Sequence, residues 1–86
     1  MRKIRIKRTR PVIIYEGTRY PEGVWLVTNS VVTEEPGCYV YFEEGERIEA
    51  KAVGVMSIYT ADRLMHNWSD SVSEVKPKKK GGKKDG

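Results

Sequence analysis

One cysteine and one histidine, Cys38 and His66, are the side chains that could act together as a catalytic nucleophile and its base. Nucleophilic catalysis needs such a pair within hydrogen-bond reach. Cys38 falls in an expected strand and His66 opposite the apolar arc of an expected helix, so we interpret both as structural or surface side chains. A single Cys and a single His also provide no metal cluster and no internal disulfide. We predict no cofactor and no metal.

Glutamates gather in two turns, at Glu34-Glu35 and at Glu43, Glu44 and Glu46. General acid–base catalysis needs two carboxylates in different environments within a cleft, whereas carboxylates in polar turns are ordinarily hydrated. The glycine-rich patterns that hold phosphates and the alternating acidic ligands of a calcium loop do not occur. We therefore predict that the protein is not an enzyme. The same glutamates form a candidate surface for a basic protein partner.

Basic residues with aromatic neighbours are the remaining chemical signal. Lys and Arg neutralise phosphates, and aromatic rings stack on bases. The sequence therefore predicts contact with DNA or RNA, and the alternative is that the first strand only pairs its charges with the glutamates. The candidate nucleic-acid contacts are Arg2, Lys3, Arg5, Lys7, Arg8, Arg10, Arg19, Tyr39, Tyr41, Lys51, Lys78, Lys79 and Lys80.

Charge is distributed unevenly along the 86 residues, whose net charge is +4. Residues 1–20 hold seven basic side chains against one glutamate, and residues 21–60 hold seven glutamates against two basic side chains. The last eleven residues hold six lysines, one aspartate and no apolar side chain. Ordering that end would bury nothing to offset the lost entropy. We predict one domain over residues 1–75 and a disordered Lys-rich tail over residues 76–86.

No apolar run is long enough for a membrane helix, and no secretory leader is recognised at the start, so we expect a cytoplasmic protein. Turn signals divide residues 11–46 into short segments rich in β-branched and aromatic residues. This pattern predicts a mainly β fold of five to six short strands in a small SH3-like or related barrel. The expected strands are residues 3–8, 12–16, 24–28, 31–33, 38–43 and 47–55.

Two of these elements allow finer predictions. A glutamate tolerates positive φ poorly, so residues 43–45 are expected to form a three-residue hairpin loop. In that register Cys38, Val40 and Phe42 face the core and Tyr39 and Tyr41 face solvent.

The last expected element is a helix over residues 61–74 that packs on the sheet. Its apolar residues fall within one arc of about 100°. Thr60 is the expected N-cap, and Pro77 ends the element.

The opening Lys3-Ile-Arg-Ile, Pro11 and the unit Gly17-x-x-Tyr20-x-x-Gly23 resemble short accessory proteins of tailed bacteriophages and prophages. In that group a helix follows the turn unit almost directly, whereas here residues 24–59 intervene. The resemblance implies a phage origin and a small non-enzymatic role, and it carries over no functional residues. Two functions follow as expectations: a nucleic-acid-binding module, or a protein-binding factor that acts on a host machine or a phage particle.

Overall fold

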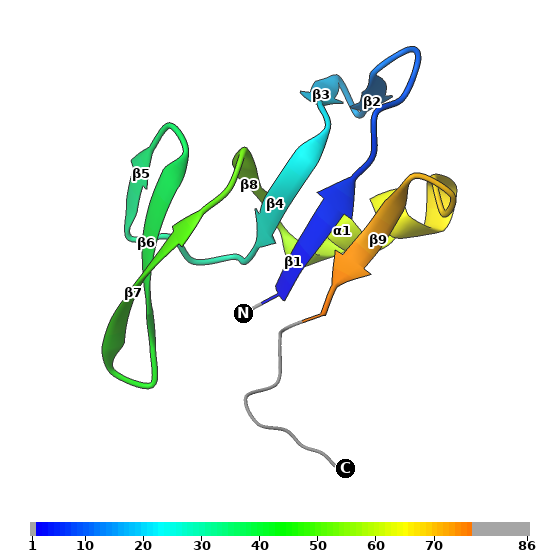
Figure 1. Cartoon of the computed structure of the whole chain (residues 1–86). Helices are drawn as coiled ribbons and strands as arrows, with labels where there is room; N and C mark the ends of the chain where they lie inside the picture. The colour runs from blue at the N-terminus through cyan, green and yellow to red at the C-terminus, as the bar shows by residue number, and fades with distance from the viewer. Residues whose placement is uncertain (1, 77–86) are drawn as a thin grey trace, which may run out of the picture.

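The alternating basic strand at the start of the chain becomes an inner strand of a four-stranded sheet in the computed structural model, which describes residues 2–76. β1 (Arg2–Ile6) pairs antiparallel with β4 (Gly23–Val27) on one side and with β9 (Val72–Val75) on the other. β8 (Gly54–Met56) runs parallel to β4, so the strand order is β8-β4-β1-β9 (Figure 1).

The other strands form two smaller antiparallel sheets. One contains β2 and β3. The other, the β5–β6–β7 sheet, contains the hairpin whose loop and register were predicted from the sequence. The described residues are thus mainly β with one helix, as predicted, and no closed barrel is found among them. These elements are β2 (Ile13–Tyr15), β3 (Thr18–Tyr20), β5 (Thr33–Glu35), β6 (Cys38–Glu43), β7 (Glu46–Lys51) and α1 (Ile58–Asn67).

The helix covers one face of the four-stranded sheet and lies behind it in Figure 1. α1 connects β8 to β9, which are the two edges of the sheet, so the chain crosses the full width of that face. Ile4, Ile6 and Leu64 are almost fully buried in the core between the sheet and the helix. Alternation along β1 directs these isoleucines into the core and leaves the basic residues between them on the opposite face.

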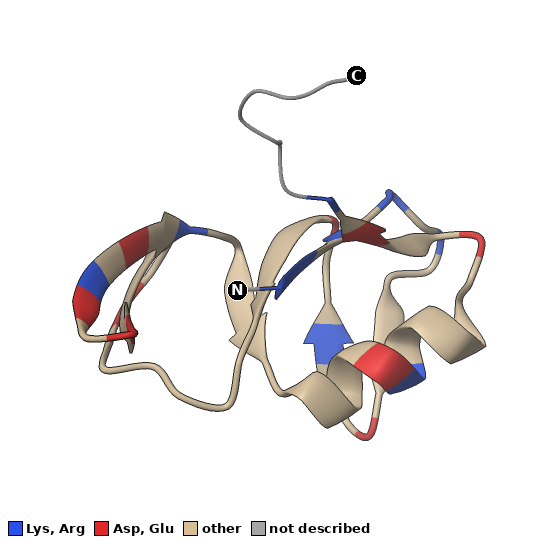
Figure 2. Cartoon of the chain, turned by 90° about the horizontal axis from the view of Figure 1, so that it is seen from below, with Lys and Arg blue, Asp and Glu red and all other residues tan. Residues whose placement is uncertain are grey.

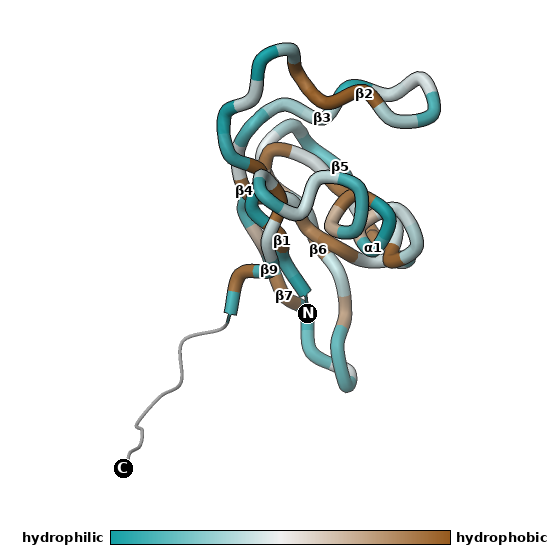
Figure 3. The backbone as a smooth tube through the Cα atoms, turned by 90° about the vertical axis from the view of Figure 1, so that its right-hand side faces the viewer, coloured by the Kyte–Doolittle hydropathy of each residue, from teal (hydrophilic) through white to brown (hydrophobic). Residues whose placement is uncertain are grey.

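Among the described residues, the opposite face of the four-stranded sheet is covered on its β4 and β8 side and not on its β9 side. Leu26 is fully buried there against Tyr39, Tyr41 and Ala50 of the β5–β6–β7 sheet. β4 is therefore buried on both faces, which explains its uninterrupted apolar run. In Figure 3 the hydrophobic stretches of the tube lie mainly in the strands, including β2, whereas the loop before β2 is hydrophilic.

The helix is shorter than predicted and begins earlier. α1 starts after Ser57, whose Oγ accepts the N–H of Thr60 at 3.1 Å, so Ser57 and not Thr60 is the N-cap. The expectation of a helix over residues 61–74 is wrong at its end, because residues 72–75 form β9. Val72 fits the helical arc, yet as a strand residue it packs opposite Ile6 and gains ladder hydrogen bonds with β1. This long-range pairing outweighs the local periodicity.

The register of the β6–β7 hairpin also differs from the prediction. Glu44 and Gly45 form a two-residue turn with φ of 53° and 82°, and Tyr41 lies opposite Ile48. The expected three-residue loop is therefore wrong, and so is the expected solvent face: Tyr39 and Tyr41 are buried while Phe42 is 56% exposed, although Val40 is buried as predicted. A left-handed non-glycine residue costs about 1–2 kcal/mol. Burying two tyrosine rings of about 150–250 Å² each contributes more stabilising free energy than this backbone cost.

The strained turn predicts that Glu44→Asn stabilises the protein by about 0.5–1 kcal/mol, because asparagine tolerates the left-handed conformation and Asn-Gly suits this turn type. The midpoint of thermal unfolding measures the effect. Glu46→Asn is the matched control, since it removes the same charge from the neighbouring strand position, where φ is not positive. Equal gains from both variants would show that relief of charge repulsion, and not backbone strain, is responsible.

Candidate nucleic-acid interface

Acidic and basic residues are separated in the folded structure as well as along the sequence. All the glutamates of residues 21–60 except Glu22 lie on the strands or turns of the β5–β6–β7 sheet, shown in red at the left of Figure 2. The basic residues at the start of the chain lie on β1 and on the loop that follows it. Folding therefore keeps most of these glutamates away from the first strand.

The basic stripe consists of Lys3, Arg5 and Lys7, which alternate with the buried isoleucines and share the face opposite α1. Lys7 continues the alternation beyond β1, since its N–H donates to the carbonyl of Ser71 at 2.8 Å. None of the three has an ion-pair partner within residues 2–76. Arg5 and Lys7 are exposed and Lys3 is half-buried. The stripe is thus an unpaired line of positive charge.

Within residues 2–76, no element packs over the β9 side of the stripe. Arg5 lies opposite Ser73, which is exposed, and Lys3 lies opposite Val75, which is half-buried. The β5–β6–β7 sheet packs instead on Leu26 and Val55, toward the other edge. A linear polyanion can therefore approach the stripe without displacing a part of the fold that the structure describes.

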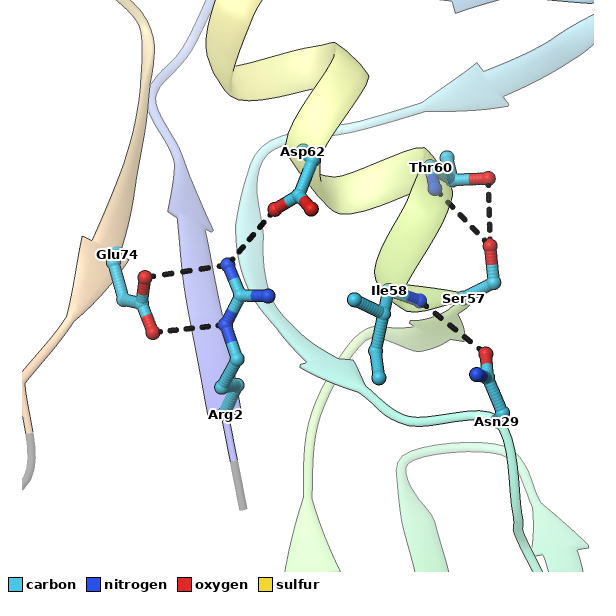
Figure 4. A network of polar contacts seen from close by, with 7 residues as sticks. All are labelled: Arg2, Asn29, Ser57, Ile58, Thr60, Asp62 and Glu74. Carbon is cyan, nitrogen blue, oxygen red and sulfur yellow. Dashed lines mark hydrogen bonds and ion pairs between the residues drawn. The ribbon is translucent and has the colours of Figure 1, made fainter.

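Arg2, the first residue of β1, has acidic partners. Its Nε contacts Glu74 Oε2 at 3.0 Å and its Nη2 contacts Asp62 Oδ1 at 3.2 Å, joining β1 to β9 and to α1 (Figure 4). The hydrogen bond to Glu74 raises the pKa of Arg2, burial opposes that change, and Asp62 adds to it. Asn29 Oδ1 accepts the N–H of Ile58 in the same region. Arg2 therefore links β1 to β9 and α1, and its side chain is less available to a ligand than those of the stripe.

The remaining basic candidates lie in different places. Arg8 pairs with Glu22 at 3.0 Å, although its side chain is 74% exposed. Arg10 and Arg19 are exposed and unpaired within the described part of the chain, Arg10 in the loop after β1 and Arg19 on β3. Lys51 is exposed at the end of β7, on a different strand from the stripe. Lys78, Lys79 and Lys80, with the predicted tail, lie outside the described residues.

The prediction that Tyr39 and Tyr41 offer exposed rings to nucleic-acid bases is wrong. Tyr39 and Tyr41 are only 7% and 5% exposed, because the hairpin register turns both rings into the core against Leu26. They have no free face for stacking on a base. The exposed aromatic rings of residues 2–76 are instead Phe42 on β6 and Tyr59 on α1.

Burial of Tyr41 predicts a loss of stability in alkali. Burial raises the pKa of Tyr41, and the carboxylate of Glu43 raises it further. The unfolded chain loses this proton near its ordinary pKa of about 10, before the folded chain does. The stability that depends on the neutral phenol is therefore complete below about pH 10 and is lost as the pH rises through the folded-state pKa.

Thermal unfolding measured from about pH 8 to 11 should show a shallower alkaline fall in Tm for Tyr41→Phe than for the wild type. Tyr59→Phe, which changes a ring that is 62% exposed, is the control and should follow the wild-type curve. An unchanged slope in Tyr41→Phe would contradict the prediction.

The glutamates of the alternative, protein-binding surface fall into two separate groups. Glu34 and Glu35 lie on β5 near the turn at Pro36-Gly37, whereas Glu43, Glu44 and Glu46 surround the opposite turn. The six residues of β6 separate the turns by about 20 Å. Glu43 lies directly opposite Glu46, a like-charge pair that destabilises a hairpin slightly. The five side chains do not form one continuous patch.

A groove that the sequence did not indicate lies beside the loop after β1. This feature, the Trp68 groove, has a volume of about 590 Å³ and is lined by residues 8–14 together with Trp68 and Ser71. Trp68 follows the last turn of α1, and its ring meets Tyr15 edge-on at 6.2 Å. The only sequence signals were Pro11 and the apolar run after it. Only folding shows that the α1–β9 turn lies beside that run.

The side chains considered for catalysis do not meet. Cys38 belongs to the β5–β6–β7 sheet and His66 is exposed on α1, and these elements pack on opposite faces of the four-stranded sheet. No group of His, Cys, Asp and Glu side chains within residues 2–76 is arranged to hold a metal ion. The single described helix, with 10 residues, is far too short to cross a membrane.

Comparison of the chain with models of protein families, with curated proteins and with solved structures finds no match.

Proposed function

We propose that this protein is a small non-catalytic module that binds nucleic acid by its phosphates, through the basic stripe of Lys3, Arg5 and Lys7. The observation that supports it is the state of these three side chains: they share one sheet face and lack acidic partners within the described residues. Cations held unpaired by a strand are poised to replace the counterions of a phosphate backbone.

The spacing of the stripe supports the same proposal. Alternate residues of a strand lie about 6.5–7 Å apart along one face. This separation is close to that of successive phosphates in an extended strand. Arg8 and Arg10 follow at the end of the stripe and extend the positive charge into the loop. Arg8 would exchange its exposed ion pair with Glu22 for a phosphate, at little cost because exposed pairs contribute about 0–1 kcal/mol.

The test is a titration of labelled oligonucleotides at several salt concentrations. If the stripe, Arg8 and Arg10 each neutralise one phosphate, log K should fall with log salt with a slope of about −3.5 to −4.5. The chain without residues 77–86 should be measured beside the full chain, so that the Lys-rich end is separated from the stripe. Absence of binding by the full chain at about 50 mM salt and tens of micromolar protein would overturn the proposal.

A second candidate function is binding of a basic protein through the glutamates of the β5–β6–β7 sheet. The separation of this acidic sheet from the basic stripe supports it, whereas the division of its glutamates between two turns weakens it. Capture of a protein that is lost when Glu43, Glu44 and Glu46 become glutamine would favour this candidate. The phage origin and the SH3-like barrel remain predictions from the sequence, and neither proposal depends on them.

A further inference from the structure

The Trp68 groove begins where the basic stripe ends. Lys7 is the last residue of the stripe and its N–H is bound to Ser71, which lines the groove, while Arg8 and Arg10 line the other side. The groove volume of about 590 Å³ lies within the range of small-ligand sites, about 300–1,000 Å³. Trp68 packs against the core on the α1 side of the sheet, so a ligand on the stripe would reach this hollow, which is large enough for a nucleotide, by passing around the end of β1 at Lys7 and Arg8.

The walls of the groove combine charge with apolar surface. Ile14 is 56% exposed although it belongs to an apolar run, and Trp68 is half-buried. The indole N–H of Trp25 donates to the carbonyl of Pro21 at 3.0 Å, whereas that of Trp68 has no acceptor within the described residues. Arginines, an indole with a free donor and an exposed aliphatic side chain together suit a flat ring that carries carbonyl groups and is attached to a phosphate.

We propose that the ligand of this surface is a single-stranded nucleic acid, with its backbone on the basic stripe and one of its bases in the Trp68 groove. This inference rests on the proposed function and names its substrate class. A duplex presents phosphates, but its bases are stacked and paired and cannot enter the groove without disruption. A single strand satisfies both parts of the surface, since base stacking adds affinity without requiring a particular sequence.

The deciding experiment compares three probes of equal length: a thymidine strand, the same backbone lacking bases, and a duplex. The thymidine strand should bind about 5- to 150-fold more tightly than the abasic strand, the gain expected from stacking one base. It should also bind more tightly than the duplex. Tryptophan fluorescence should change on binding the thymidine strand and not the abasic strand, because Trp25 is buried and Trp68 lines the groove.

Two variants locate the base. Trp68→Leu keeps an apolar side chain but removes the ring, and Ile14→Ser changes an exposed position that should not affect folding. Both should reduce the preference for the thymidine strand over the abasic strand. Phe42→Leu removes an exposed ring from the β5–β6–β7 sheet and is the matched control that should keep the preference.

The outcomes separate the two proposals. Equal affinity for thymidine and abasic strands, or tighter binding of the duplex, would overturn the single-strand inference while leaving phosphate binding intact. A preference that survives Ile14→Ser and a folded Trp68→Leu would place the base elsewhere and also overturn it. Undiminished binding of all probes after replacement of Lys3, Arg5 and Lys7 would overturn the proposed function itself.

Discussion

Replacing Lys3, Arg5 and Lys7 together by glutamine is expected to lower the affinity for nucleic acid by about two to three orders of magnitude at about 50 mM salt. Each lost phosphate contact removes the release of roughly one counterion, so the slope of log K against log salt should become shallower by about 2–3. Glutamine keeps much of the stem of each side chain, and the three charges have no partners within the described residues. The thermal midpoint should therefore stay near that of the wild type.

The matched control is a variant in which Arg47, Lys51 and Arg63 become glutamine. It removes the same total charge from β7 and α1 and leaves the stripe intact. Its affinity and salt slope should stay within a few-fold of the wild type. A loss as large as that of the stripe variant would mean that net charge and not the position of the cations governs binding, which would contradict the proposed interface.

The second large effect is expected at Gly54, where Ala is predicted to destabilise the protein by about 1–3 kcal/mol. A Cβ at this position would clash with Cζ3 of Trp25, whose ring packs over β8. The ring is 8% exposed and its N–H is bound to the carbonyl of Pro21, so it cannot simply swing aside. Small domains are stable by only about 5–15 kcal/mol, so the loss is a large part of the total.

Chemical denaturation with a double-mutant cycle tests this contact. Trp25→Leu should be less harmful in the Gly54→Ala background than in the wild type, because it removes the atoms that the new methyl group meets. Gly37→Ala is the control for loss of a glycine: its φ is +84°, but no atom lies within 4 Å of the new Cβ. It should cost only about 1–2 kcal/mol of backbone strain. Additive effects at Gly54 and Trp25 would contradict the predicted clash.

Local signals predicted much of the secondary structure. β6 spans the predicted residues 38–43, and β1 and β4 lie within one or two residues of the predicted strands. The sequence does not predict β3, because its three residues are too few to show the alternation of apolar and polar side chains that is typical of a strand. The pattern predicts one strand over residues 47–55, whereas the structure has β7 and β8 in different sheets, because nothing in the residues between them signals that the chain passes from one sheet to another.

The faces of the hairpin and the end of the helix could not be predicted locally. Val72 fits a helix and a strand equally well, and only its position beside Ile6 decides between them. Tyr41 faces the core because Leu26 lies there to be covered. Each choice depends on a residue far away in the sequence, which periodicity does not reveal.

Strand side chains alternate with a period of two, so the sequence alone predicts that Lys3, Arg5 and Lys7 share one face. The sequence alone also shows that acidic and basic residues occupy different segments. The folded structure is needed to show which cations remain unpaired, since Arg2 pairs with Glu74, 72 positions away in the chain, and Arg8 pairs with Glu22. It alone placed Trp68 beside the loop after β1. Alternation is a property of the local backbone, whereas ion pairs and grooves form between segments that only folding brings together.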